Sequence, residues 1–265
     1  MNKKYDILII DDEEVIINAI KMIATFNELT TATAINPKDA LALLEEAEFN
    51  LIITDIMMPE MDGFQFLEIV KQMKIKTPVI MTTGYSTLEN AIRALNCGAI
   101  AFVPKPFSFE ELTSVFKRGM EYSKITNKLN SRNDCDDLLS IIPCPPKYYR
   151  LGFDSWMNEE YTGTVKIGVT DLFLNSVGTL DSIDIMNVDE NIYQGNTSLK
   201  IIDSNEYIHQ VLSPISGKIV SVNEKLLENI NLLAKDPYFE GWIYTIIPFS
   251  IEVEIKNLTS CSSDI

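Results

Sequence analysis

Three aspartates are the first residues of this sequence whose spacing points to chemistry. Asp11 and Asp12 follow the apolar run YDILII, and Asp55 follows the apolar run LIIT. If both runs are strands of one parallel sheet, these side chains meet beyond the carboxyl ends of the strands. Carboxylates crowded at one edge repel one another unless a cation lies among them. Because oxygen donors without His or Cys suit Mg²⁺, the pattern predicts a magnesium site.

A hydroxyl group and an ammonium group are predicted at the same edge. Thr82 and Thr83 end the apolar run PVIMTT, and Lys105 follows the run AFV, directly before Pro106. Together with the carboxylates and a metal, these groups suit a tetrahedral anion carried by a carboxylate. The single histidine, His209, has no evident Ser or Cys partner, so no catalytic residue is predicted.

Alternating strand-like and helix-like segments must position these residues. Over the first 120 residues, five short apolar runs alternate with five segments of helical period, and Pro, Gly, Ser and Asn mark the boundaries. One of these segments, PKDALALLEEAEF, is predicted to be helical from residue 37 to 49. The alternation predicts an α/β domain with a parallel sheet and helices on both faces.

The second half of the chain has a different pattern. Residues 123–147 are rich in Asn, Ser and Asp and contain PCPP, which excludes a helix interior and predicts a linker. From residue 148 onward, short β-rich runs alternate with turn residues, which predicts a mainly-β sandwich or barrel. The run NEKLLENINLLAK, at 223–235, is predicted as one or two short helices. A hairpin with its tip at residues 204–207 is also predicted.

Charge and cysteine usage exclude several classes of function. The formal net charge is −16, from 22 basic and 38 acidic residues, which disfavours nucleic acid and anionic membrane surfaces as partners. The N-terminus lacks a signal-peptide core and no apolar run is long enough to span a membrane, so a cytoplasmic location is expected. The cysteines lack C-x-x-C spacing, so free thiols are expected rather than a zinc site; they are Cys97, Cys135, Cys144 and Cys261.

Five motifs in register resemble the receiver domain of two-component response regulators. The similarity covers about residues 3–122, and a domain is predicted at 1–122. The resemblance implies a flavodoxin-like, doubly wound (βα)₅ fold and a sensor histidine kinase as phosphodonor. The motifs are DD at 11–12, DIMMP at 55–59, MDG at 61–63, TG at 83–84 and KPF at 105–107.

The resemblance also implies a role for each matching residue. Asp55 would accept the phosphoryl group and help to hold Mg²⁺. Asp12 would bind the metal directly, Asp11 largely through water, and Met57 through its backbone carbonyl. Lys105 would pair with the phosphoryl oxygens. The alternatives are a helix N-cap for the two neighbouring aspartates and a solvated loop position for the lysine.

Two further residues would form the switch. Thr83 would turn toward the phosphoryl group and Phe102 would follow it inward, which would alter the face of the fourth helix, fifth strand and fifth helix. For Phe102 the alternative is an ordinary core aromatic. A cis peptide bond is expected before Pro106.

About residues 148–250 resemble the H protein of the glycine cleavage system, a lipoyl carrier of the single-hybrid type. A domain is therefore predicted at 148–255, followed by a tail at 256–265. In that family a hairpin tip holds a lysine that is acylated by lipoate. Counting back from the SPISG motif places Glu206 at this position, whereas counting forward from Gly195 places Asn205 there. Neither has an amine, and Lys200 lies inside the expected strand, so lipoate is not expected. The motifs are IGVTD at 167–171, SPISG at 213–217, VNEKLLEN at 222–229 and DPYFEGW at 236–242.

Together the resemblances predict a response regulator of a two-component phosphorelay that is not an enzyme. Its receiver would use Mg²⁺ and control a non-lipoylated H-like module, whose protein target the sequence does not identify. The alternative is a carrier subunit of glycine cleavage or one-carbon metabolism, modified at an unexpected lysine and tuned by phosphorylation. Neither nucleic acid nor a membrane is an expected partner, and a homodimer formed through the receiver stays open.

Overall fold

The computed structural model describes residues 3–130 and 141–264 and divides into two compact units. The first consists mainly of residues up to 132 and the second mainly of residues from 133 onward. The predicted linker begins too early, because residues 123–130 continue the helix α5 (Phe109–Asn130), where Ser123 and Ile125 are still buried. The central part of the linker, residues 131–140 with Cys135, lies outside the described residues.

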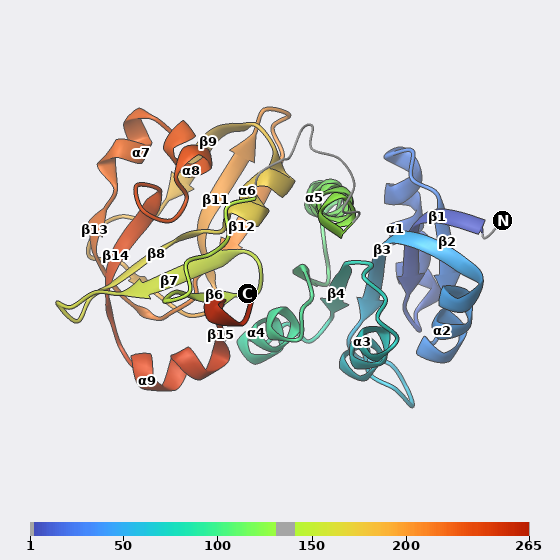
Figure 1. Cartoon of the computed structure of the whole chain (residues 1–265). Helices are drawn as coiled ribbons and strands as arrows, with labels where there is room; N and C mark the ends of the chain where they lie inside the picture. The colour runs from blue at the N-terminus through green and yellow to red at the C-terminus, as the bar shows by residue number, and fades with distance from the viewer. Residues whose placement is uncertain (1–2, 131–140, 265) are drawn as a thin grey trace. The chain divides into compact units, whose positions relative to one another are not determined.

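The first unit has the predicted doubly wound architecture. Its five strands are all parallel, in the order β2-β1-β3-β4-β5, and helices lie on both faces (Figure 1). This strand order puts a topological switch point between β1 and β3. The strands are β1 (Lys3–Ile10), β2 (Thr31–Ala34), β3 (Ala47–Asp55), β4 (Val79–Thr83) and β5 (Ala101–Pro104). The helices that alternate with these strands are α1 (Glu14–Phe26), α2 (Pro37–Glu46), α3 (Gly63–Gln72), α4 (Leu88–Asn96) and α5 (Phe109–Asn130). Of these, α4 is grouped with the second compact unit.

The sheet of the first unit is buried on both faces, which explains its continuous apolar runs. Residues 7–10 of β1 and 51–53 of β3 are each at most 1% exposed. A parallel sheet covered by helices on both sides leaves no face for polar residues. In these two strands the polar side chains therefore lie before or after the fully buried stretches.

The third strand begins earlier than the sequence predicts. Residues 47–49 were predicted to continue the preceding helix, but they belong to β3 and pair with residues 3–5 of β1. The helical period of ALALLEE carries into AEF, but pairing with β1 outweighs this local preference.

The helix starts are fixed by side chains to different degrees. Oδ1 of Asn36 accepts the N–H of Asp39 at 2.9 Å, so α2 has a capped start before its first-turn proline. Asp62 and Gln65 form a reciprocal capping box on α3, with distances of 2.7 and 3.0 Å. In contrast, the N-cap residue of α1 is Glu13, and its side chain makes no capping hydrogen bond.

The second unit is mainly β, as predicted. One antiparallel sheet has the order β10-β13-β14-β8-β7-β6-β15, and a smaller one has the order β12-β11-β9 (Figure 1). Two short helices, α7 and α8, confirm the prediction for residues 223–235. The strands are β6 (Tyr149–Leu151), β7 (Ser155–Glu159), β8 (Val165–Val169), β9 (Leu180–Ile185), β10 (Asn191–Ile192), β11 (Thr197–Asp203), β12 (Ile208–Leu212), β13 (Gly217–Val222), β14 (Trp242–Pro248) and β15 (Thr259–Ser260). The helices are α6 (Asp171–Val177), α7 (Glu224–Glu228), α8 (Asn231–Lys235) and α9 (Ile251–Glu254), with 3-10 turns η1 (Ile255–Asn257) and η2 (Cys261–Asp264).

An aromatic cluster fixes the loops of the second unit to its larger sheet. The indole Nε1 of Trp156, which is 1% exposed, donates to the carbonyls of Val169 and Pro237 at 3.0 and 3.1 Å. The ring of Tyr148 lies 5.0 Å from that of Trp156, and its hydroxyl donates to the carbonyl of Tyr238 at 3.1 Å. These bonds satisfy the polar ends of large buried side chains, which allows the rings to pack without an unpaired donor.

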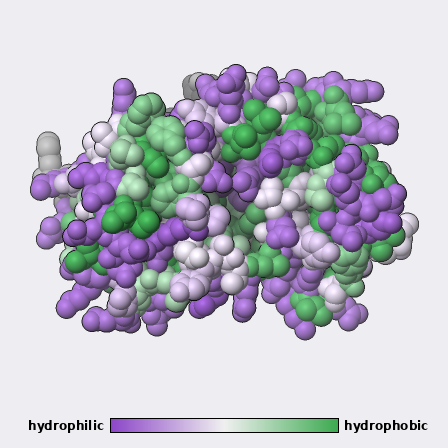
Figure 2. Space-filling model, turned by 180° about the vertical axis from the view of Figure 1, so that it is seen from behind, coloured by the Kyte–Doolittle hydropathy of each residue, from purple (hydrophilic) through white to green (hydrophobic). Residues whose placement is uncertain are grey.

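The surface mixes polar and apolar residues. On the face seen in Figure 2, hydrophobic residues form separate patches between hydrophilic ones. Within the part of the chain that the structure describes, none of the helices combines the length and the hydropathy that crossing a bilayer requires.

Asp6 gives the first unit a pH-dependent contribution to stability. Its carboxylate accepts the N–H and hydroxyl of Thr30 at 2.8 and 2.6 Å and the amide of Asn50 at 3.2 Å. Burial acts to raise the pKa of Asp6, but the hydrogen bonds from Thr30 and Asn50 outweigh it and hold the pKa below its ordinary value. The stabilisation is therefore complete above the ordinary carboxyl pKa and is lost as the pH falls through the lowered one.

We predict that Asp6→Asn destabilises the first unit by about 1 kcal/mol at pH 7, because the amide has one acceptor oxygen for three donors. The difference from wild type should shrink as the pH falls below about 4. Urea unfolding followed by far-UV circular dichroism measures it. Fluorescence reports the second unit separately, since both tryptophans lie there. Asp181→Asn, at an exposed position of β9, is the control; a difference that persists unchanged at pH 2.5 would contradict the assignment.

Candidate functional site

Asp11, Asp55 and Lys105 meet at the carboxyl edge of the parallel sheet. Nζ of Lys105 lies 2.6 Å from Oδ2 of Asp11 and 2.8 Å from Oδ1 of Asp55. Asp11 directly follows β1 and Asp55 ends the adjacent β3, whereas Lys105 follows β5, two strands away. The structure thus brings together three residues that are 44 or more positions apart in sequence.

The two oxygens of Asp55 have different environments. The residue is 3% exposed, and its Oδ2 accepts the backbone N–H of Met57 at 2.7 Å. Its Oδ1 is buried and receives no aligned hydrogen bond from the described residues, although the ammonium of Lys105 is close. A buried carboxylate oxygen without a directed donor is available to a metal or to an electrophile.

Burial and the attraction between carboxylate and ammonium shift the pKa values of Asp55 and Lys105 in opposite directions. Burial raises the pKa of Asp55, and the charge of Asp11 adds to this, while the attraction of Lys105 and the Met57 N–H only partly offset it. For Lys105, burial acts to lower the pKa, but Asp11 and Asp55 outweigh it, so the pKa lies above its ordinary value. The lysine is therefore a permanent cation at neutral pH.

Asp11 holds the start of α1 as well as the lysine. Its Oδ1 accepts the backbone N–H of Glu13 at 3.0 Å, and the residue is fully buried. Asp12, in contrast, is exposed. Since Glu13 is the N-cap of α1, neither aspartate occupies that position. The sequence patterns singled out the aspartates but not Glu13, whose carboxylate lies 3.9 Å from Nζ of Lys105.

The donor set at this edge fits a hard divalent cation. It comprises the carboxylates of Asp11, Asp12 and Asp55 and the backbone carbonyl of Met57, without His or Cys. The buried Oδ1 of Asp55, which lacks an aligned donor, is the observation that supports this fit. Among the described residues no three acidic, His or Cys side chains already form a metal-binding group, and Lys105 takes the place of the cation between two of the carboxylates.

Three further residues were predicted at this edge, and they differ in burial and in backbone geometry. Thr83 is fully buried, and its hydroxyl accepts the N–H of Tyr85 at 3.1 Å. Phe102, on β5, is half-buried. The peptide bond between Lys105 and Pro106 is cis.

The loop after Asp55 depends on a close approach at Gly63. A Cβ atom at this position would lie 2.3 Å from the carbonyl oxygen of Asp55 and 3.0 Å from Cα of Ile56. The N–H of Gly63 also donates to the carbonyl of Ile56 at 2.9 Å. The first residue of α3 therefore packs directly against the end of β3, which fixes the loop that contains Met57.

In the second unit, β11 and β12 form the predicted hairpin. Oδ1 of Asp203 accepts the N–H groups of Asn205 and Tyr207 at 2.8 and 3.0 Å, so this buried carboxylate shapes the tip. Glu206 is exposed and has a left-handed backbone with φ +66°, and its N–H donates to the carbonyl of Asp203 at 2.9 Å. Both candidates for the lipoyl position, Asn205 and Glu206, thus lie on this exposed tip without an amine.

His209 and Lys200 lie along the same hairpin. His209 is 3% exposed, and its Nε2 lies 3.3 Å from Oδ2 of Asp203. The histidine therefore belongs to the buried support of the tip. Lys200 lies within β11 and forms an ion pair of 3.7 Å with Asp184 on β9, with its side chain 48% exposed.

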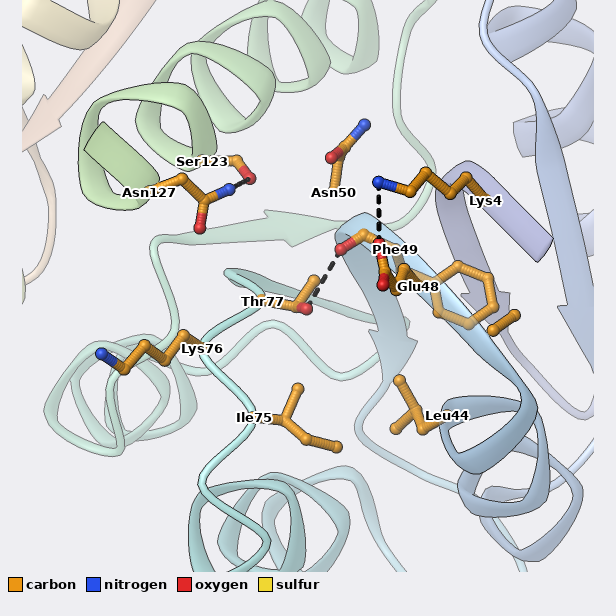
Figure 3. Close-up of a pocket in the computed structure, with 11 residues that line it drawn as sticks. Lys4, Leu44, Glu48, Phe49, Asn50, Ile75, Lys76, Thr77, Ser123 and Asn127 are labelled. Carbon is orange, nitrogen blue, oxygen red and sulfur yellow. Dashed lines mark hydrogen bonds and ion pairs between the residues drawn. The ribbon is translucent and has the colours of Figure 1, made fainter. Parts of the chain in front are cut away.

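A pocket of about 410 Å³ lies at the opposite end of the parallel sheet (Figure 3). The starts of β1 and β3, the loop before β4 and the last part of α5 line it. Figure 3 shows Leu44 and Ile75 on one side and Asn50, Ser123 and Asn127 on the other. The length of β3, roughly 25 Å, separates this pocket from the acidic edge, the carboxyl edge of the sheet where Asp11, Asp55 and Lys105 meet. The pocket is therefore distinct from the site described above.

In comparisons with known proteins, the two parts of the chain match two different families. Residues 7–117 match the model of the response regulator receiver domain, and residues 147–263 match the model of the glycine cleavage H-protein. The chain therefore carries both kinds of sequence, as the motifs indicated.

Relatives and solved structures cover the same two parts. A putative response regulator NtrX-like from Rickettsia bellii is 37% identical over 122 residues, which are 45% of this chain and 26% of that protein. The chain spans about a quarter of the length of the curated relatives it matches. A receiver domain protein from Methanospirillum hungatei is 33% identical, with a TM-score of 0.43 over 47% of this chain and 98% of its own. An H protein from Mycobacterium marinum is 25% identical, with a TM-score of 0.37 over 40% and 87%.

We predict that Gly63→Ala destabilises the first unit by about 1–3 kcal/mol, because the methyl group must displace the backbone of Asp55 and Ile56. Far-UV circular dichroism in urea measures the change. Gly84→Ala is the matched control, since a Cβ atom there meets nothing within 4 Å, and it should stay within about 0.5 kcal/mol of wild type. Equal unfolding midpoints for the two variants would contradict the close approach.

Proposed function

We propose that this chain is a two-component response regulator whose Asp55 accepts a phosphoryl group from a histidine kinase. The observation that carries the proposal is the buried Oδ1 of Asp55, which has no aligned donor and lies 2.8 Å from Lys105 within a receiver-domain sequence. In this proposal the chain transmits a signal and is not an enzyme.

The transfer proposed at Asp55 is a simple displacement. Oδ1 attacks the phosphorus of the donor's phosphohistidine, a phosphorus–oxygen bond forms, and the phosphorus–nitrogen bond breaks. The electron pair of that bond returns to the imidazole nitrogen, and Asp55 becomes an acyl phosphate. Lys105 faces the charge that gathers on the phosphoryl oxygens, since its ammonium already lies beside the accepting oxygen. The N–H of Met57 holds the other oxygen and fixes the direction of attack.

Asp11, Asp12, Asp55 and the carbonyl of Met57 are the residues that would hold Mg²⁺. A divalent cation bound there supplies positive charge to phosphoryl oxygens. The ion pairs of Lys105 with Asp11 and Asp55 keep the carboxylates together before the metal arrives, because they reduce the repulsion between the two negative charges.

The switch is proposed to begin at Thr83. A phosphoryl oxygen on Asp55 would accept the hydroxyl hydrogen of Thr83, and a turn of the side chain toward it would weaken the hydrogen bond that Oγ1 accepts from the N–H of Tyr85 in this structure. Phe102, half-buried on the neighbouring strand, would follow Thr83 inward. The output is the H-like module, acting as a protein-binding domain without lipoate, since its hairpin tip presents a carboxylate or carboxamide in place of an amine.

We predict that purified wild-type protein incubated with Mg²⁺ and phosphoramidate gains one phosphoryl group that hydroxylamine removes. Asp55→Asn should abolish the gain, because the carboxamide is not a nucleophile at this position. Intact-mass spectrometry measures both. Asp39→Asn, which changes an exposed carboxylate in the first turn of α2, is the control and should be labelled like wild type. Persistent labelling of the Asp55 variant, or none of wild type, would exclude the proposed acceptor.

The competing function, a lipoyl carrier of one-carbon chemistry, requires a modified lysine. Lys200 is the nearest to the tip, but it lies within β11 and pairs with Asp184. We predict that the protein shows no lipoyl adduct in its intact mass, even when a lipoate ligase and lipoate are supplied. A genuine H protein that is labelled in the same reaction is the positive control. An adduct that Lys200→Arg removes would instead favour the carrier.

A further inference from the structure

Glu13 is a charged residue at the acidic edge. It belongs to none of the sequence motifs, and its side chain does not cap a helix. Its side chain is 65% exposed, and Oε1 lies 3.9 Å from Nζ of Lys105. As the N-cap of α1 it would be expected to bond the first turn, but it makes no capping hydrogen bond. Its backbone is fixed instead, because its N–H donates to Oδ1 of Asp11 at 3.0 Å. The backbone of Glu13 therefore has a defined position beside Asp11, from which its carboxylate comes within 3.9 Å of the ammonium of Lys105.

Lys105 is shared among three carboxylates. It lies 2.6 Å from Asp11, 2.8 Å from Asp55 and 3.9 Å from Glu13. One positive charge thus faces three negative ones, and the exposed Asp12 adds another beside them. The two aspartates that touch the lysine are buried, whereas the side chain of Glu13 is largely exposed to solvent.

We propose that Glu13 is a positioning residue that makes the site discriminate against small anionic phosphodonors and in favour of a protein donor. The proposal rests on phosphorylation of Asp55. Glu13 slows phosphorylation by a small anion in two ways. Its negative charge repels a free anion at the entrance, and its attraction holds Lys105 back from the phosphoryl oxygens. A protein donor offsets this repulsion with binding energy from its contact surface, which a small anion lacks.

The exposure of the Glu13 side chain determines how large a change in phosphorylation rate is expected. A solvent-exposed carboxylate near a lysine interacts weakly, so the expected change in rate is about two- to five-fold. Interactions of this kind are screened as the Debye length falls to about 3 Å in 1 M salt. The effect should also scale with the charge of the donor, which no change in folding or packing would reproduce.

The test compares two phosphodonors on wild type, Glu13→Gln and Glu14→Gln at saturating Mg²⁺. Acetyl phosphate carries two negative charges at neutral pH and phosphoramidate one. In low salt, Glu13→Gln should accelerate phosphorylation by acetyl phosphate about two- to five-fold and by phosphoramidate less, and the gain should disappear in 1 M salt. Glu13→Lys should extend the gain. Glu14→Gln is the control, since Glu14 is the next residue, also exposed, and forms no ion pair among those described.

Two results would overturn the role of Glu13 while leaving phosphorylation of Asp55 intact. One is labelling of Glu13→Gln at the wild-type rate with both donors. The other is an equal change for both donors, or an equal change in the Glu13 and Glu14 variants, since that would reflect folding or overall charge. Failure of wild type to be labelled by either donor would overturn the proposed function and this inference with it.

Discussion

The contact of one lysine with two buried carboxylates is the interaction on which the acidic edge depends. Asp11 and Asp55 lie at the ends of adjacent strands, where their charges repel in a poorly solvated place. Lys105 reaches them from β5 and compensates the repulsion. Within this pair, Oδ1 of Asp55 is buried and receives no aligned hydrogen bond from the described residues, so the nearby ammonium of Lys105 offsets part of its desolvation cost.

The rest of the first unit serves to hold that arrangement still. The strands are apolar and covered on both faces, so they cannot slip without exposing core residues to water. The capping box of Asp62 and Gln65 and the close approach of Gly63 fix α3 against the end of β3. The loop with Met57 therefore has a defined path, and its N–H reaches Asp55 at 2.7 Å. Rigid scaffolding thus places a small number of polar groups at one edge.

In the second unit, buried groups support the exposed tip of the hairpin formed by β11 and β12. Asp203 accepts two backbone N–H groups of the tip and faces His209 from within the hairpin. These buried partners define the loop independently of the exposed apex, where Glu206 adopts a left-handed conformation. A scaffold of this kind tolerates changes at the apex, because little of its stability depends on the exposed side chains. The absence of an amine at the tip and the retention of the hairpin are therefore compatible.

The sequence by itself determined the order of elements, the parallel sheet, the mainly-β second unit and the convergence of Asp11, Asp55 and Lys105, because these follow from hydrophobic period and from where polar residues interrupt it. Tertiary structure alone decided the early start of β3, the pairing of β15 with β6, and the place of Glu13 beside Lys105. Those features depend on contacts between residues far apart along the chain. Their energies come from pairing and charge in three dimensions, which local period and composition do not encode.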